Sequence, residues 1–120
     1  MAQQTILIAD DSKTQLLHLK SILETAGYLT ITANSGNQAI ELSEKLNFDM
    51  IMLDIVMADG DGYKACRSIR KNPALTDIPI IMVSSKANPV DKHWAKRLGA
   101  TDYIVKPFKD SEVLTKVATF

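Results

Sequence analysis

Five short apolar runs alternate with five longer segments of helical periodicity along this chain, and that alternation narrows the choice of fold more than any other feature. Three of the runs are apolar at nearly every position, which is typical of strands covered on both faces of a parallel sheet. The second run alternates with threonine, which favours an edge strand. The runs are residues 6–9, 28–33, 50–53, 78–83 and 103–105.

The segments between the runs carry helix start and stop signals. The third helix is expected over about residues 61–71, and the last from about residue 110 to the C-terminus. Strict alternation of strands and helices predicts an α/β fold, with right-handed βαβ units around a doubly wound sheet. The boundary residues are Gly27 as a stop, Ser35 as a cap, Asn88-Pro89 as a start and Gly99 as a stop.

Composition predicts one soluble domain, since 120 residues with 46% hydrophobic content suffice for a single core. Fourteen lysines and arginines balance fourteen acidic residues, so the chain lacks the excess basic charge of a nucleic-acid binder. Cys66 is the sole cysteine, which excludes an intramolecular disulfide and a CxxC metal site. No signal peptide or membrane span is evident, so we expect a cytoplasmic protein without membrane insertion.

Polar residues follow four of the predicted strands. Asp10 and Asp11 follow the first, Asp54 the third and Lys106 the fifth, while Ser84 closes the fourth. The carboxyl ends of parallel strands meet at one edge of the sheet, so these side chains are expected in one crevice. Three crowded carboxylates repel one another, and Mg²⁺ relieves such repulsion. Metal, ammonium and hydroxyl together suit a phosphoryl group, with a carboxylate as nucleophile.

Each of these residues has a simpler interpretation when taken alone. Asp11 or Ser12 is a plausible helix cap, Ser84 a turn residue and Lys106 a solvated lysine. Chance would have to place all of them on the same sheet edge. The joint pattern therefore favours a functional site.

These residues also carry a family resemblance, which extends over essentially the whole chain. The sequence resembles the receiver (response-regulator) domains of bacterial two-component signalling. The resemblance implies a single receiver domain over residues 1–120 without an output domain, and a flavodoxin-like five-stranded sheet in the order 2-1-3-4-5. Residues 91–103 are similar, more narrowly, to stand-alone receivers of type IV pilus twitching-motility systems. The matching stretches are residues 6–12, 52–57, 61–62, 80–85, 99–100 and 102–108.

The resemblance assigns a role to each site residue. It implies that a histidine kinase phosphorylates Asp54 and that a downstream motility or signalling protein binds the surface formed by the fourth helix, fifth strand and fifth helix. The chain would catalyse only its own phosphorylation and dephosphorylation, as a monomer or weak dimer. The implied roles are Mg²⁺ binding by Asp10, Asp11, Asp54 and the backbone carbonyl of Val56, phosphoryl binding by Ser84 and Lys106, a switch at Tyr103 and a cis Lys106-Pro107 bond.

Three positions depart from the usual receiver pattern. Ala58 stands where many receivers have proline, so the loop of residues 58–62 is expected to be looser. Val56 lies two residues after Asp54, and its side chain cannot orient an attacking water. Lys86 lies two residues after Ser84. Because these positions flank the phosphoryl group, we expect a modified dephosphorylation rate.

Other functions stay open at this point. A phosphate sink or a phosphorylation-independent interaction module is compatible with the same fold. A haloacid-dehalogenase-type phosphatase would need a second aspartate two residues after its nucleophile, where this chain has Val56. A flavodoxin-like FMN binder would need a first loop rich in serine, threonine and glycine, whereas Asp10 and Asp11 would repel a phosphate.

The predicted fourth helix carries features that this function does not use. Trp94 is interpreted first as a partly buried packing residue and, alternatively, as a hot spot for a partner. Lys92, Lys96 and Arg97 form either a solvated face or, together with Tyr103, a surface that a partner contacts.

Overall fold

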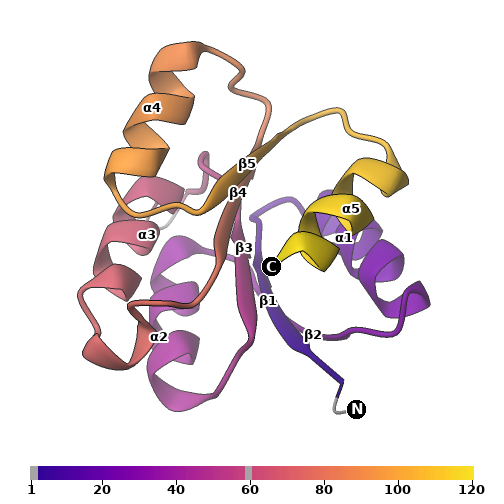
Figure 1. Cartoon of the computed structure of the whole chain (residues 1–120), viewed down its shortest axis with the longest axis horizontal. Coiled ribbons are helices and arrows are strands. Elements are labelled where there is room, and N and C mark those ends of the chain that lie inside the picture. Colours follow the sequence, from indigo (N-terminus) through magenta and orange to yellow (C-terminus); the bar gives the residue numbers. More distant parts are fainter. Residues whose placement is uncertain (1–2, 59–60) are drawn as a thin grey trace.

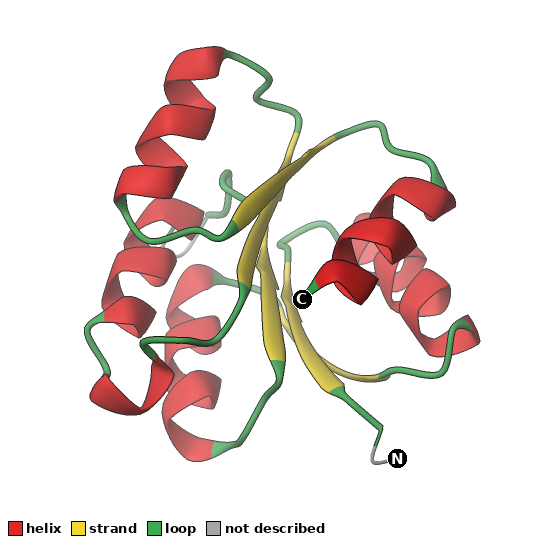
Figure 2. Ribbon diagram, in the orientation of Figure 1, coloured by secondary structure: helices red, strands yellow, loops and turns green. Residues whose placement is uncertain are grey.

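A computed structural model describes residues 3–58 and 61–120 of the chain. The strands are all parallel and lie in the order β2-β1-β3-β4-β5, which confirms the predicted doubly wound α/β sheet (Figures 1 and 2). The strands are β1 (Thr5–Ala9), β2 (Leu29–Ala33), β3 (Met50–Leu53), β4 (Ile80–Ser84) and β5 (Asp102–Val105). The helices are α1 (Lys13–Thr25), α2 (Gly36–Lys45), α3 (Gly62–Arg70), α4 (Pro89–Arg97) and α5 (Asp110–Thr119).

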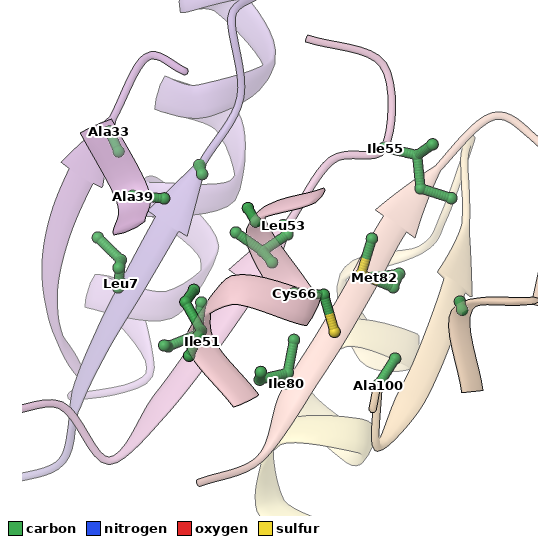
Figure 3. Packing of buried hydrophobic residues seen from close by; sticks show 14 of the residues in the cluster. Leu7, Ala33, Ala39, Ile51, Leu53, Ile55, Cys66, Ile80, Met82 and Ala100 are labelled. Atoms are coloured by element: carbon green, nitrogen blue, oxygen red, sulfur yellow. The ribbon is translucent and has the colours of Figure 1, made fainter. Parts of the chain in front are cut away.

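The sheet lies between two helical layers, with α2, α3 and α4 on one face and α1 and α5 on the other (Figure 1). Alternate strand residues divide between two cores: Leu7 and Ile51 face the first layer, whereas Ile8 and Met52 face the second. The residues of β1, β3 and β4 in both cores are buried, as their apolar runs predicted. The first layer contributes small residues, which let its helices approach the sheet closely. Figure 3 shows part of this core, including Ala39 and Cys66.

Most predicted helix boundaries are confirmed. The side chains of Ser12, Ser35 and Asp61 accept hydrogen bonds from backbone N–H groups in the first turns of α1, α2 and α3. Gly27 and Gly99 follow the ends of α1 and α4 with φ of 98° and 112°, a conformation that glycine adopts without strain. Asn88 precedes α4 as predicted, but its side chain makes no capping hydrogen bond.

Three further expectations concern single segments. The strand β2 does lie at a sheet edge, as its alternation with threonine predicted. A short 3-10 helix over Pro73–Leu75 was not anticipated. The expected looseness of the loop of residues 58–62 depends on residues 59–60, which lie outside the described residues. Among the helices that the structure describes, none has the length and apolar character needed to cross a membrane.

Candidate functional site

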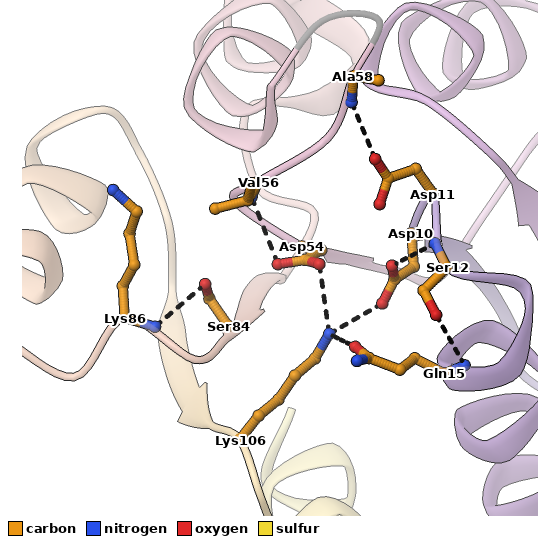
Figure 4. A network of polar contacts seen from close by, with 10 residues as sticks. All are labelled: Asp10, Asp11, Ser12, Gln15, Asp54, Val56, Ala58, Ser84, Lys86 and Lys106. Atoms are coloured by element: carbon orange, nitrogen blue, oxygen red, sulfur yellow. Dashed lines mark hydrogen bonds and ion pairs between the residues drawn. The ribbon is translucent and has the colours of Figure 1, made fainter.

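The carboxyl edge of the sheet brings together all five polar residues that the strand ends predicted (Figure 4). Asp10 and Asp11 follow β1, Asp54 follows β3, Ser84 ends β4 and Lys106 follows β5. Carboxylate oxygens of the three aspartates lie within 4.8 Å of one another. The predicted crevice is therefore present, and its members come from four different strands.

Lys106 joins two of the carboxylates. Its Nζ lies 2.9 Å from Asp10 Oδ2 and 3.2 Å from Asp54 Oδ2, and it also donates to Gln15 Oε1. The three charged side chains are only 14%, 8% and 12% exposed. Buried charges of opposite sign at this separation compensate one another, whereas each alone would be costly. Lys106 is thus the internal counter-ion of the acidic crevice.

Asp54 is harder to ionise than an ordinary aspartate. Burial raises the pKa of its carboxyl group, Lys106 opposes that rise, and the charge of Asp10 adds to it. Its Oδ1 accepts a weak hydrogen bond from the Val56 N–H at 3.4 Å, while its Oδ2 faces Lys106. An anionic Asp54 therefore depends on nearby positive charge, which is the electrostatic setting of a nucleophile controlled by cations.

The other two aspartates are held by backbone groups. Asp10 Oδ1 accepts the Ser12 N–H at 2.9 Å, and the exposed Asp11 accepts the Ala58 N–H at 3.0 Å. These bonds help to fix both carboxylates beside Asp54. Oxygen donors of this kind are the ligands that Mg²⁺ prefers, so the acidic cluster fits a magnesium site.

A hydrogen-bonded chain leads from Ser84 to Tyr103 through the Lys86 backbone. The fully buried Ser84 accepts the Lys86 N–H on its Oγ at 3.3 Å. The Tyr103 hydroxyl donates to the Lys86 carbonyl at 2.6 Å. Burial raises the pKa of Tyr103, so the phenol stays protonated and able to donate. A displacement of Ser84 would therefore reach the tyrosine ring through the Lys86 backbone.

A cleft opens beside Asp54 and Lys106. Its volume is about 450 Å³, and it runs between α1 and the segment after β5. His18 and Phe108 lie at its rim with stacked rings, their centroids 5.8 Å apart. The Lys106-Pro107 bond in that segment is cis, as the resemblance implied. The cleft gives Asp54 access from outside the molecule.

Sequence reasoning missed two residues of this site. Gln15 lies in the first turn of α1 and accepts a hydrogen bond from Lys106. Gly62 lies beneath Asp54, and a Cβ atom there would be 2.1 Å from the Asp54 carbonyl oxygen. The pair Asp61-Gly62 contributed to the resemblance, but without a role. A glycine immediately after a helix cap was the available signal of close backbone approach.

Comparison with known proteins gives a consistent result. The family model "Response regulator receiver domain" matches residues 6–118. Protein PilH of Pseudomonas aeruginosa is 39% identical over 92% of this chain and 91% of its own length. The chain spans only 44% of a probable transcriptional regulator, ycf27, of Guillardia theta, which is 36% identical.

Solved structures agree with the sequence relatives. The chemotaxis protein CheY4 of Vibrio cholerae aligns with a TM-score of 0.94 at 30% identity, covering 98% of both chains. The receiver domain of a sensor histidine kinase from Pseudomonas aeruginosa aligns with a TM-score of 0.91 at 30% identity, covering 98% of this chain and 97% of that one. That structure has a magnesium ion coordinated in its active site cleft.

Proposed function

We propose that this chain, which belongs to the response-regulator receiver family, accepts a phosphoryl group on Asp54 from the phosphohistidine of a histidine kinase. The observation that carries the proposal is the convergence of Asp10, Asp54 and Lys106, with Lys106 bonded to both carboxylates. The chain then signals by protein–protein contact. It acts in the cytoplasm and catalyses only its own phosphorylation and dephosphorylation.

The chemical step is a displacement at phosphorus. A carboxylate oxygen of Asp54 forms a bond to phosphorus, and the bond from phosphorus to the histidine nitrogen breaks. The electron pair of that bond returns to the imidazole, and Asp54 becomes an acyl phosphate. The cleft beside Asp54 offers room for the donor imidazole to approach in line.

Mg²⁺ would be held by the carboxylates of Asp10, Asp11 and Asp54 together with the Val56 backbone carbonyl. When bound, it would offset negative charge on the acceptor and on the phosphoryl oxygens. Lys106, already within reach of Asp54, would pair with one phosphoryl oxygen. Ser84 would turn its hydroxyl to donate to another. The site therefore supplies a cation or a donor for the charge that develops in transfer.

Tyr103 is the proposed reporter of this change. When Ser84 Oγ turns toward the phosphoryl group, it leaves the Lys86 N–H that it now accepts. The β4–α4 loop is then free to shift and to release the Tyr103 hydroxyl from the Lys86 carbonyl. New charge at Asp54 would thus bias the surface formed by α4, β5 and α5 toward a second arrangement. That surface is where a downstream partner would detect phosphorylation.

Intact-mass analysis with a small phosphodonor and Mg²⁺ tests the acceptor assignment. We expect a single phosphoryl adduct on the full chain, dependent on Mg²⁺ and absent from Asp54→Asn. The matched control is Asp77→Asn, which changes an exposed aspartate remote from the site in sequence and should keep the adduct. An adduct that persists in Asp54→Asn would reject Asp54 as the acceptor. If no adduct accumulates, beryllofluoride-induced spectral changes decide whether the site forms at all.

The pathway is a second part of the proposal. The similarity to PilH supports a role in pilus-dependent motility, with residues 1–120 acting as a single receiver domain that signals through its partners. Expression of this chain in Pseudomonas aeruginosa lacking PilH should restore twitching on a surface, whereas Asp54→Asn should not. Restoration by Asp54→Asn would instead favour a phosphorylation-independent interaction module. An output regulator is separated from a phosphate sink by whether the phosphorylated chain binds a motility protein.

A further inference from the structure

The charges of this chain are unevenly distributed. Residues 62–99 contain eight of the fourteen lysines and arginines but only two of the fourteen acidic residues. Their formal charge is +6, and the rest of the chain carries −6. A net charge of zero therefore conceals one basic segment in an otherwise acidic molecule. Such a separation creates a local field that a charged partner can detect.

The basic segment includes α3 and α4, which lie side by side on the same face of the sheet (Figure 1). One contact joins the first turns of the two helices, and two more join α3 to the residues that directly follow α4. The Tyr63 hydroxyl donates to Asp91 Oδ1 at 3.0 Å, the Cys66 Sγ lies 3.7 Å from the Leu98 carbonyl, and Arg70 Nε lies 2.8 Å from the Gly99 carbonyl.

Six cations of this layer are exposed, and none forms an ion pair with another described residue. Three lysines elsewhere, Lys45, Lys106 and Lys116, do pair with a carboxylate. The repulsion within the layer is thus left to solvent, salt or a partner. We call this the basic α3–α4 surface, and it consists of Lys64, Arg67, Lys71, Lys92, Lys96 and Arg97.

Two apolar side chains of α4 lie on the same flank of the helix as Arg97, whereas Lys92 and Lys96 lie on the flank that faces Asp102 and Tyr103 of β5. Val90 is 76% exposed and Trp94 is 50% exposed, one helical turn apart on α4. Arg97 follows on the same side of the helix. Tryptophan and arginine are the residues most enriched in the hot spots of protein interfaces, where an apolar anchor lies beside a charged group. The half-exposed Trp94 also shows that its interpretation as a packing residue accounts for only part of its surface.

We propose that the basic α3–α4 surface binds an acidic segment of a partner protein, with Val90 and Trp94 as the apolar contacts. The nine residues of α4 extend over about 13 Å, which matches a short helix or strand. A nucleic acid or a membrane would extend beyond this surface and meet the acidic remainder of the chain. Binding needs no phosphoryl group on Asp54, so the inference goes beyond the proposed function and stands or fails separately from it.

Fluorescence of Trp94, the only tryptophan of the chain, tests the proposal directly. The unphosphorylated full chain is titrated with a short amphipathic peptide of Glu and Leu, and with the same peptide carrying Gln in place of Glu. We expect a saturable blue shift of the emission, an affinity for the acidic peptide at least about tenfold higher, and weakening with salt. Equal affinity for the two peptides would overturn the proposal.

Charge reversal locates the binding. The variant Arg67→Glu with Lys96→Glu should lower the affinity for the acidic peptide by about tenfold or more. The matched control, Lys13→Glu with Lys20→Glu, makes the same change of net charge on α1, across the sheet, and should stay within about twofold of the original. Equal losses in the two variants would show non-specific attraction and overturn the assignment. Circular dichroism verifies the fold of both variants.

The same assay distinguishes the other candidate ligands of this surface, namely a membrane and a nucleic acid. Phosphatidylserine vesicles and duplex DNA, at the same ionic strength, should leave the Trp94 emission unchanged. Tighter binding to either than to the acidic peptide would overturn the proposal and assign a membrane or nucleic-acid contact. Sedimentation of the chain alone at low salt should show a monomer. Self-association that the variant Arg67→Glu with Lys96→Glu abolishes would instead assign the surface to a second copy.

Discussion

The carboxyl edge of the sheet and the basic α3–α4 surface both contain clustered charges, but the two regions differ in how those charges are buried and paired. At the edge, charges of both signs are largely buried, and Lys106 pairs with both Asp10 and Asp54. On the surface, charges of one sign are exposed and unpaired among the described residues. A buried charge must be compensated inside the fold, whereas an exposed one is solvated until a partner arrives. The first arrangement suits chemistry and the second suits recognition.

Gly62 is the first residue of α3 and lies against the backbone of Asp54. The variant Gly62→Ala is expected to have the largest effect on stability. A Cβ atom would lie 2.1 Å from the Asp54 carbonyl oxygen, so α3 would have to move away from Asp54. We expect a loss of about 3 kcal/mol or more in the free energy of unfolding, measured by urea denaturation. Gly27→Ala is the control, since it introduces strain at φ of 98° but no clash, and should cost about 1 kcal/mol. A cost for Gly62→Ala no larger than that of Gly27→Ala would contradict this account.

Replacing a lysine by methionine in each region sharpens the contrast. Lys106→Met leaves Asp10 and Asp54 without their buried counter-ion, so the free energy of unfolding should fall by about 2–4 kcal/mol at neutral pH without Mg²⁺. Lys96→Met removes an exposed, unpaired charge and should stay within about 0.5 kcal/mol. Urea denaturation of both variants measures the difference.

Mg²⁺ should reduce the loss in Lys106→Met, because a second cation replaces the missing one. Binding to the folded state alone raises stability in proportion to RT ln(1 + [L]/Kd). Lys96→Met should gain no more from Mg²⁺ than the unaltered chain. Equal effects of Mg²⁺ on both variants would contradict the view that Lys106 compensates the carboxylates where the metal binds.

The fold and the charged site could be predicted because both follow from strand positions. Once residues 6–9 and 50–53 are buried parallel strands, Asp10 and Asp54 must emerge at the same edge. The contacts that depend on main-chain atoms or on side-chain packing leave no comparable pattern in the sequence. The Lys86 peptide links Ser84 to Tyr103 through main-chain atoms, which any residue would supply. The role of Gln15 depends on which rotamer reaches Lys106, and that is decided by the packed structure.

The thiol of Cys66 reports whether solvent reaches the interior beneath the basic α3–α4 surface. Burial raises the pKa of its thiol from 9.0 to about 11, against a small opposing effect of Arg70. The thiol therefore ionises at lower pH in the unfolded chain than in the folded one. As a result, the free energy of unfolding falls as the pH rises from about 9 to about 11. Cys66→Ala lacks this loss, while other groups titrate alike in both proteins.

Relative to the unaltered chain, Cys66→Ala should thus gain about 2 kcal/mol of stability between pH 8 and pH 11. Urea denaturation under reducing conditions at several pH values measures the difference. A constant difference across this range would mean that solvent reaches the thiol. The interior beneath the surface cations would then be accessible to solvent, and the contrast with the buried carboxyl edge would weaken.

The smallest expected effect comes from Tyr63→Phe, which removes the tie between the first turns of α3 and α4. The Tyr63 hydroxyl donates to Asp91 Oδ1 at 3.0 Å, and burial followed by the Asp91 interaction raises the tyrosine pKa, so the donor stays protonated at neutral pH. Its loss should cost about 1 kcal/mol and lower hydrogen-exchange protection in α4 but not in α1. Tyr103→Phe, which removes the bond to the Lys86 carbonyl, is the matched control and should act on the β4–α4 loop instead. Unchanged protection in α4 would mean that the Cys66 and Arg70 contacts suffice to hold the two helices together, and that the basic α3–α4 surface keeps its shape without this hydrogen bond.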